Sequence, residues 1–254
     1  ISSWYAPFIE SFLKHPTIDP WSQWLSQGGS DQAFPYGLGM LAAFLPLSAL
    51  AQISNGLISI GTAMMITLLI FDLALLFVIT LLSDGAVKKA LVYYWISPIT
   101  LGATYVLGFN DIIPVAFLAA SVLFLRKSHG LTSGLLALVA VSIKASMLLA
   151  IPVFLILFLR NRTVRVLAAR YSVGFSLGVL CLILPFFALC PGGVRMIALN
   201  KEAQKIWGPI FELGVNSAVL LVPLTYALAL YLLWSVKRLN MDLFEAGLGL
   251  VFLM

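Results

Sequence analysis

The chain has 254 residues, of which 61% are hydrophobic and 10% are charged, and its formal net charge is +5. A soluble domain has roughly 45–50% apolar and about 25% charged residues, so this composition argues against a soluble protein and predicts an all-α, polytopic membrane protein. The positive charge does not predict a nucleic-acid partner. The basic residues lie in short clusters between apolar runs, where they indicate membrane topology.

Residues 1–56 precede the first long apolar run, and we expect them to form a large outer loop. This segment is rich in tryptophan and tyrosine, which are typical of a membrane interface, and it carries three spaced acids, Glu10, Asp19 and Asp31. One interpretation is an interfacial helix that lies flat on the membrane. The other is a site where aromatic rings and carboxylates bind a sugar or another polyol, with one acid acting as general base.

The loop closes with the sequence FPYGLGMLAAFLPL (34–47), which is apolar but too short to cross a membrane. From Gly37 to Pro46 a helix would be about 15 Å long, half of the roughly 30 Å hydrocarbon layer. We therefore predict a re-entrant half-helix that enters from the outer face, is cut off at Pro46 and turns back at ISNG (53–56), with Tyr36 before its first turn. Such backbone is tolerated where protein covers it or where it lines a wet cavity.

Seven apolar runs and one truncated run follow, and we expect each of them to be a transmembrane helix. The runs are 57–82, 91–107, 112–125, 131–144, 147–159, 171–189, 217–236 and 243 onward. Ten of the fifteen basic residues fall in alternate connections, so the positive-inside rule assigns those connections to the cytoplasm. The 1–56 loop and the 190–216 loop then face outward.

The chain is read as one transmembrane domain, residues 1–254. It comprises the outer loop with its half-helix (1–56), a helical core (57–189), a second outer loop (190–216) and the C-terminal helices (217–254). The sequence opens without an initiator methionine and closes inside an apolar run. We therefore expect a fragment that is truncated at both ends.

Three of the apolar runs are too short for a full span, namely 112–125 and the runs on either side of Lys144. Each has about 13–14 residues, or roughly 20 Å of helix. Because basic residues fix their inner ends, the turns GFND (108–111) and KAS (144–146) should lie at the floor of an outer depression. The alternative is one long helix over 131–159 with a snorkelling lysine, which breaks the alternation of charge.

Ionisable residues at membrane depth are the first functional candidates. Asp111 is suited to binding a cation, pairing with Lys144 or capping the helix that follows it. The Lys144 ammonium needs an anion, either a phosphate from the outer leaflet or the Asp111 carboxylate. Asp72 is expected to be an interhelical hydrogen-bond partner. Arg195, in the second outer loop, belongs either to a solvated helix or to a phosphate site, and the two histidines offer no zinc site.

The order of these features resembles the GT-C superfamily of integral-membrane glycosyltransferases, over residues 1 to about 160. An aromatic first loop ends in FPYG (34–37), and a helix with an internal acid follows, LLIFDLALLF (68–77). Next come YYWISPITLGATYVLGFNDIIPVAFLAASVLFLRK (93–127) and SIKASMLLAIPVFLILFLR (142–160). These segments are similar to the family's Ser-Pro-Ile stretch, its acidic turn and its pair of helices with a lysine and then a proline.

The resemblance implies a mannosyltransferase-like enzyme that moves a sugar from a polyprenyl-phosphate donor to a hydroxyl of a glycan, lipid or protein, with inversion. Basic residues or a divalent metal ion would stabilise the leaving phosphate. Lys144 is the foremost phosphate candidate and Arg195 the second, with Asp111 and Tyr36 as further binding residues. The family's general base usually follows the first transmembrane helix, upstream of residue 1. Among the acids present, Asp19, Glu10 and Asp31 are the candidates, in that order.

Functions from other classes stay open. A secondary transporter also has broken helices with buried charges, but it should show an internal repeat, and none is visible. A lipid-linked polysaccharide ligase or polymerase shares the phosphate chemistry, and a non-catalytic assembly subunit is a further alternative. Besides its substrates, the chain's expected partners are membrane lipids. The expected location is a bacterial inner membrane with the active site facing outward, or a membrane whose outward face is the endoplasmic reticulum lumen.

Overall fold

The computed structural model describes residues 5–54, 57–201, 210–214 and 217–253, and most of these residues are helical. The helices of the first half are α1 (Ala6–Lys14), α2 (Pro20–Ser26), α3 (Leu38–Ile53), α4 (Ile60–Leu82), α5 (Val87–Ala90), η1 (Leu91–Trp95), α6 (Pro98–Leu101), η2 (Gly102–Val106) and α7 (Ile112–Arg126). Those of the second half are α8 (Gly130–Ile143), η3 (Ala145–Leu149), α9 (Ala150–Arg160), α10 (Arg162–Arg165), α11 (Ala168–Gly178), η4 (Val179–Ile183), α12 (Leu184–Leu189), α13 (Pro191–Ala198), α15 (Leu221–Ser235) and α16 (Met241–Leu253). The exception to the predicted all-α class is an antiparallel hairpin of β1 (Ile210–Gly214) and β2 (Ser217–Leu220).

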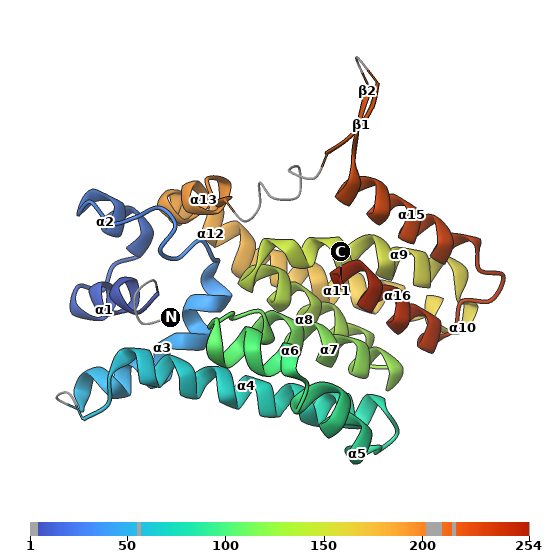
Figure 1. Cartoon of the computed structure of the whole chain (residues 1–254), viewed down its shortest axis with the longest axis horizontal. Coiled ribbons are helices and arrows are strands. Elements are labelled where there is room, and N and C mark those ends of the chain that lie inside the picture. The colour runs from blue at the N-terminus through green and yellow to red at the C-terminus, as the bar shows by residue number, and fades with distance from the viewer. Residues whose placement is uncertain (1–4, 55–56, 202–209, 215–216, 254) are drawn as a thin grey trace.

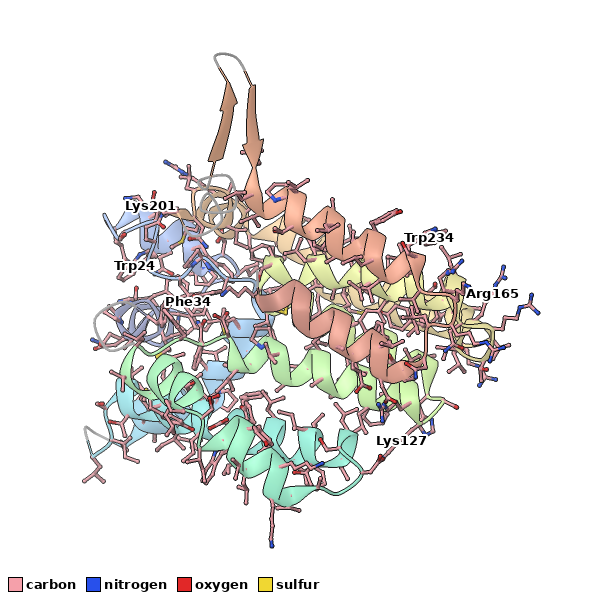
Figure 2. The ribbon with its side chains drawn as sticks, turned by 45° about the vertical axis from the view of Figure 1, so that its right-hand side comes forward. Trp24, Phe34, Lys127, Arg165, Lys201 and Trp234 are labelled. Atoms are coloured by element: carbon pink, nitrogen blue, oxygen red, sulfur yellow. The ribbon has the colours of Figure 1, made fainter. Side chains whose placement is uncertain are left out.

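The long helices run between two ends of the molecule that differ in their side chains. At one end α1, α2 and α13 gather, and α10 lies at the other (Figure 1). Figure 2 shows Trp24 and Lys201 toward the first end, and Lys127 and Arg165 toward the second. We call these the aromatic end and the basic end. Lys127 and Arg165, which the sequence assigns to the cytoplasm, thus lie toward the same end of the molecule and away from the aromatic loop.

The lengths of the helices show which of the predicted spans could cross a membrane. Within the described residues, two helices are long and apolar enough to cross a membrane, Ile60–Leu82 and Ala168–Leu189. The shorter apolar helices are Leu38–Ile53, Ile112–Arg126, Gly130–Ile143, Ala145–Arg160 and Leu221–Ser235. An integral membrane protein is therefore supported, and the number of seven spans stays a prediction.

Helix α3 corrects the prediction that the half-helix ends at Pro46. It continues through this proline to Ile53, the first residue of the ISNG segment where the turn back is predicted, and has 16 residues, or about 24 Å of helix. A proline inside a helix loses one backbone hydrogen bond but does not stop the helix when the flanking residues are held by packing. Here Phe44 and Ser48, on either side of Pro46, are both fully buried. The helix is still shorter than a bilayer span, and it lies in the half of the molecule that carries α1 and α2 (Figure 1).

The break at Lys144 is confirmed, and the alternative of one long helix over 131–159 is wrong. Lys144 has an extended backbone (φ −143°, ψ 123°) between α8 and η3. Other predicted runs needed revision. The 91–107 run is not one regular helix but the short α-helix α6 between the π-helical turns η1 and η2. The 217–236 run begins as the strand β2 before it becomes α15.

Asp72 explains how the irregular 91–106 segment is held against α4. The carboxylate is fully buried, and it accepts hydrogen bonds from the Tyr94 and Tyr105 hydroxyls and, at 3.0 Å, from the Trp95 indole nitrogen. Three donors from one segment therefore converge on one acid of the neighbouring helix. The expectation that Asp72 is an interhelical hydrogen-bond partner is confirmed.

Two cores hold the helices together. One lies among α7, α8, α9, α11 and α16, where the Phe154 ring stacks on Tyr171 at 5.2 Å between centroids and meets Phe244 edge-on. The other fixes the aromatic loop: the Phe8 and Phe34 rings stack at 4.7 Å, and the buried Trp21 indole donates a hydrogen bond of 3.0 Å to the Phe34 carbonyl. Residues 5–37 are thereby attached to the helical core as a packed element.

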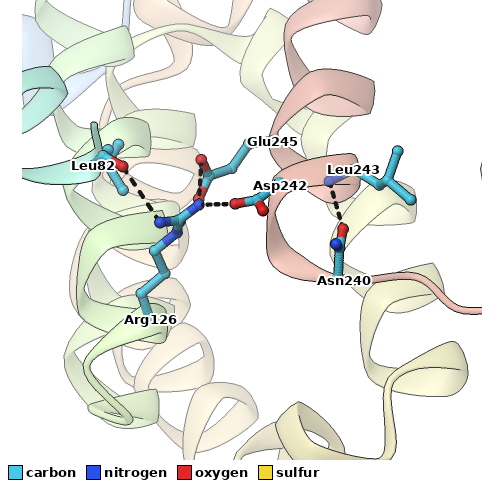
Figure 3. Close-up of polar contacts among 6 residues, drawn as sticks. All are labelled: Leu82, Arg126, Asn240, Asp242, Leu243 and Glu245. Carbon is cyan, nitrogen blue, oxygen red and sulfur yellow. Dashed lines mark hydrogen bonds and ion pairs between the residues drawn. The ribbon is translucent and has the colours of Figure 1, made fainter. Parts of the chain in front are cut away.

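At the basic end, Arg126 ties the C-terminal helix to the bundle (Figure 3). Its guanidinium, at the end of α7, donates to both carboxylate oxygens of Glu245 and to one oxygen of Asp242, both on α16. It also donates a hydrogen bond of 3.3 Å to the Leu82 carbonyl at the end of α4. The planar fork of an arginine suits such a bidentate contact with a carboxylate.

Candidate functional site

Two glycines bring the FPYG element against the lysine turn, although more than 100 residues separate them in the chain. A Cβ atom on Gly37 would lie 2.1 Å from the Ser142 carbonyl oxygen, and one on Gly39 would lie 2.5 Å from the Ser142 hydroxyl. Any side chain at these positions would force α3 away from the end of α8. The start of α3 therefore lies directly beside Ser142 and Ile143, the residues that precede Lys144.

Lys144 and Asp111 form an ion pair at this place. The Lys144 ammonium donates to the Asp111 carboxylate, and the side chains are 27% and 48% exposed, respectively. Asp111 stands at the N-cap of α7 without a side-chain capping bond. Of the roles considered for Asp111, the structure therefore shows the pair with Lys144 and not the helix cap. Because both side chains are partly exposed, an anion from solution can compete with the carboxylate for the lysine.

Tyr36 lies at the same place, as the sequence predicts. Its side chain is buried, its hydroxyl is 3.0 Å from the Tyr5 hydroxyl, and the Asp111 charge acts on it. Burial raises the pKa of Tyr36 well above its usual value, and Tyr5 and Asp111 raise it further. The phenol therefore stays protonated at neutral pH, so it can take part in hydrogen bonds but cannot act as a base.

Asn110 is a residue of this site that sequence reasoning did not select. It is 2% exposed, and its amide nitrogen has no hydrogen-bond partner within the described part of the chain. The side chain lies close enough to Tyr36 to lower the pKa of its phenol, without completing a hydrogen bond of normal geometry. The GFND turn marks the position of Asn110, but nothing in the sequence indicates that its amide is buried and unpaired.

The three acids of the first loop point to other partners. Both carboxylate oxygens of Asp19 accept backbone N–H groups, one from Ser22 at the start of α2 and one from Gly192 in α13. Glu10 forms an exposed ion pair with Lys14, one turn along α1. Asp31 accepts a hydrogen bond from its neighbour Gln32, whose side chain also bonds the end of α13. None of the three acids has a hydrogen bond or ion pair with Asp111 or Lys144.

Arg195 also lies apart from the lysine turn. It is exposed on α13 and has no ion pair within the described residues. It borders an open hollow of about 420 Å³ between α2 and α13, whose lining is Ser22, Leu25, Ser26, Pro191, Gly192 and Arg195. The structure thus groups Tyr36, Asp111 and Lys144, while Arg195 and the three loop acids belong to the contacts of α1, α2 and α13.

The residues present do not fit the divalent metal ion that the GT-C resemblance leaves open. Magnesium and calcium are bound by several oxygen ligands, usually including carboxylates. In the described ranges no three His, Cys, Asp or Glu side chains gather in a metal-binding group. The carboxylate at the site, Asp111, is taken by Lys144.

Comparison with known families supports the resemblance to GT-C glycosyltransferases. The family model of the ALG3 protein matches residues 39–194, from the first turn of α3 to α13, which is more than half of the chain. No curated protein and no solved structure matches. The matched region contains Asp72, the GFND turn and Lys144. The chain therefore belongs to the ALG3 protein family, a membrane mannosyltransferase family of the GT-C class.

Proposed function

We propose that the chain transfers a mannosyl residue from a polyprenyl-phosphate donor to a hydroxyl of a glycan acceptor, with inversion at the anomeric carbon. The observation that carries the proposal is the grouping of Tyr36, Asp111 and Lys144 at the break between α8 and η3. This grouping offers a phosphate-binding cation, a hydroxyl that stays protonated and a partly open position. The family membership favours this reaction over a transporter.

In the proposed reaction the acceptor oxygen attacks the anomeric carbon while the bond from that carbon to the phosphate oxygen breaks. The phosphate leaves as a monoester with one additional negative charge. The Lys144 ammonium stabilises that charge, which is greater in the transition state than in the bound donor. The carboxylate of Asp111, displaced from Lys144 by the phosphate, moves toward solvent.

The acceptor's proton needs a base, and the loop acids differ in their suitability. Asp19 uses both oxygens to join α2 with α13, and Glu10 faces Lys14. Asp31 is the least committed of the three, because its recorded partner is the side chain of Gln32. Within the described residues, none of them has a hydrogen bond or ion pair with Lys144 or Asp111. Which acid takes the proton therefore stays a prediction, and Asp31 is the least committed of the three candidates.

We place the reaction on the face of the membrane that borders the aromatic end. The ALG3 family consists of mannosyltransferases of the endoplasmic reticulum. This favours the lumen of that organelle over the outer face of a bacterial inner membrane. The basic end would then face the cytosol, in agreement with the positive-inside rule.

The proposal is tested by replacing Lys144 with methionine in the full-length protein. Methionine keeps the length and apolar contacts of the lysine stem and removes its charge. We expect binding of a polyprenyl phosphate to weaken by at least about tenfold, because a hydrogen bond to a charged group contributes roughly 1.5–3 kcal/mol. Binding is measured by microscale thermophoresis or by retention of the lipid in native mass spectrometry.

The matched control is Lys14→Met, which removes an equivalent charge from α1 at the same end of the molecule. Lys14 is exposed, and its partner is Glu10. Its loss should leave lipid binding unchanged. If Lys144→Met binds polyprenyl phosphate as tightly as the unaltered protein, Lys144 is not the phosphate ligand and the proposed mechanism fails.

A further inference from the structure

Two buried polar atoms within the described residues have no hydrogen-bond partner, the hydroxyl oxygen of Ser48 and the amide nitrogen of Asn110. A buried donor without a partner has lost its hydrogen bonds to water and gained none in the protein, which destabilises the folded state. Such groups are rare in native proteins, and each one needs an explanation. Their surroundings differ, and the difference suggests that one of them has a ligand.

Ser48 lies inside α3, two residues after Pro46, and its residue is fully buried. No ionisable side chain forms a hydrogen bond or ion pair with it. A serine hydroxyl is small, and no contact of Ser48 within the described residues points to a ligand beside it. Ser48 therefore serves as the structural reference for an unpaired buried group.

Asn110, in contrast, lies where groups that attract an anion converge. It precedes α7, a helix of 15 residues whose N-terminus carries partial positive charge and has no side-chain cap. The next residue, Asp111, is held by the Lys144 ammonium. The Asn110 side chain lies beside Tyr36, on which the Asp111 charge also acts, so the amide, the helix terminus and the ammonium belong to one cluster. At present the Asp111 carboxylate is the anion in that cluster.

We propose that the Asn110 amide donates a hydrogen bond to a phosphate oxygen of the donor lipid when that phosphate replaces the Asp111 carboxylate on Lys144. Asn110 is then a second phosphate-binding residue, and its unpaired state belongs to the enzyme without substrate. The inference rests on the proposed function, because it takes the phosphate of that reaction as the ligand. It accounts for the unpaired amide, which the ion pair alone leaves unexplained.

The test is Asn110→Leu in the full-length protein, with polyprenyl phosphate as the probe. Leucine has nearly the shape of asparagine and needs no hydrogen bond, so thermal stability should be unchanged or higher. Binding of polyprenyl phosphate should nevertheless weaken by about tenfold or more, as expected for a hydrogen bond to a charged group. Binding of the unphosphorylated polyprenol should not change, which separates the phosphate from the hydrocarbon chain.

Ser48→Ala is the matched control, because it removes the other unpaired buried group. It should likewise leave stability unchanged or higher, and it should not alter lipid binding. If Asn110→Leu behaves as Ser48→Ala does, the unpaired amide is only a structural imperfection and the inference is overturned.

A second variant keeps the inference testable if Asn110→Leu does not fold. Asn110→Asp retains the shape but places a carboxylate beside the phosphate, so binding should weaken more than with leucine. Unchanged binding by this variant would equally overturn the inference. The outcome for Lys144→Met separates the two proposals. If Lys144→Met weakens binding of polyprenyl phosphate and the Asn110 variants do not, only the role of Asn110 is rejected. If Lys144→Met does not weaken this binding, the proposed phosphate site itself is rejected.

Discussion

At the scale of single residues, the ionisable groups divide into a structural acid and an exchangeable pair. Asp72 is fully buried, and two tyrosines and a tryptophan satisfy its carboxylate. Asp111 and Lys144 hold each other but stay partly exposed. A fully satisfied buried network rigidifies the elements that it joins, whereas an exposed pair yields to a competing ion. This difference leads us to assign Asp72 to the fold and Lys144 to the substrate.

The structural role of Asp72 is tested with Tyr105→Phe, which removes one donor from its carboxylate. We expect a loss of about 1 kcal/mol in stability, in the range of side-chain hydrogen bonds between membrane helices. The loss is measured as a lower midpoint of thermal unfolding in detergent. Tyr93→Phe is the control, because Tyr93 is in the same segment and is 80% exposed. Equal midpoints for the two variants would contradict the assignment.

Part of the site was predictable from the sequence at this scale. Lys144 and Asp111 stand out because a charge at membrane depth has few partners, and Tyr36 follows from the short apolar run that begins after it. Asn110 could not be predicted, because whether an amide is paired depends on neighbours that are distant in the chain. The roles of Asp19 and Gly192 in joining α2 to α13 also depend on tertiary contact.

At the scale of elements, the alternation of basic connections predicted one helix end correctly, whereas a proline predicted another wrongly. The break at Lys144 was expected because it preserves the alternation of basic connections, and the structure has it. The predicted end at Pro46 was wrong, since burial on both sides carries α3 past the proline. The π-helical turns η1 and η2 were not visible either. Their donors to Asp72 come from three residues whose spacing has no simple helical period.

The close crossing of α8 and α11 depends on glycines from both helices. A Cβ on Gly174 would lie 2.0 Å from the Leu131 carbonyl oxygen, and one on Gly134 would lie 2.0 Å from the Tyr171 carbonyl oxygen. These contacts are with backbone atoms, which cannot rotate away as a side chain can. The small residues of the GFSLG segment (174–178) thus allow the approach that the GxxxG pattern predicts.

We therefore expect Gly174→Ala to destabilise the protein by about 1–3 kcal/mol, the usual range for overpacking. The measurement is thermal or denaturant unfolding. The control is Gly249→Ala on α16, where an added Cβ meets nothing within 4 Å. That substitution should be neutral or stabilising by about 1 kcal/mol, because alanine favours a helix more than glycine does. If Gly174→Ala left the stability unchanged, α8 and α11 could move apart without a loss of stability.

At the scale of the whole molecule, charge is distributed unequally between the two ends. Eight exposed cations have no ion pair within the described residues and lie in the connections assigned to the cytoplasm; they are Lys88, Lys89, Lys127, Arg162, Arg165, Arg170, Lys237 and Arg238. Arg126, in contrast, is neutralised by Asp242 and Glu245. The aromatic end has the candidate site and few cations. This polarity is what the positive-inside rule requires if the site faces away from the cytosol.

The orientation is tested by placing single cysteines at the two ends of the full-length protein. Arg165→Cys reports on the basic end, and Lys201→Cys reports on the aromatic end; both side chains are exposed. The background has Cys181 replaced by alanine, because Cys181 is exposed, whereas Cys190 is buried. In sealed microsomes, a membrane-impermeant maleimide should label Arg165→Cys directly. It should label Lys201→Cys only after detergent opens the vesicles, since that end is expected in the lumen. Labelling of both cysteines in sealed vesicles would contradict the proposal that the two ends lie on opposite sides. Labelling of Lys201→Cys alone would reverse the proposed orientation and with it the face on which the donor binds.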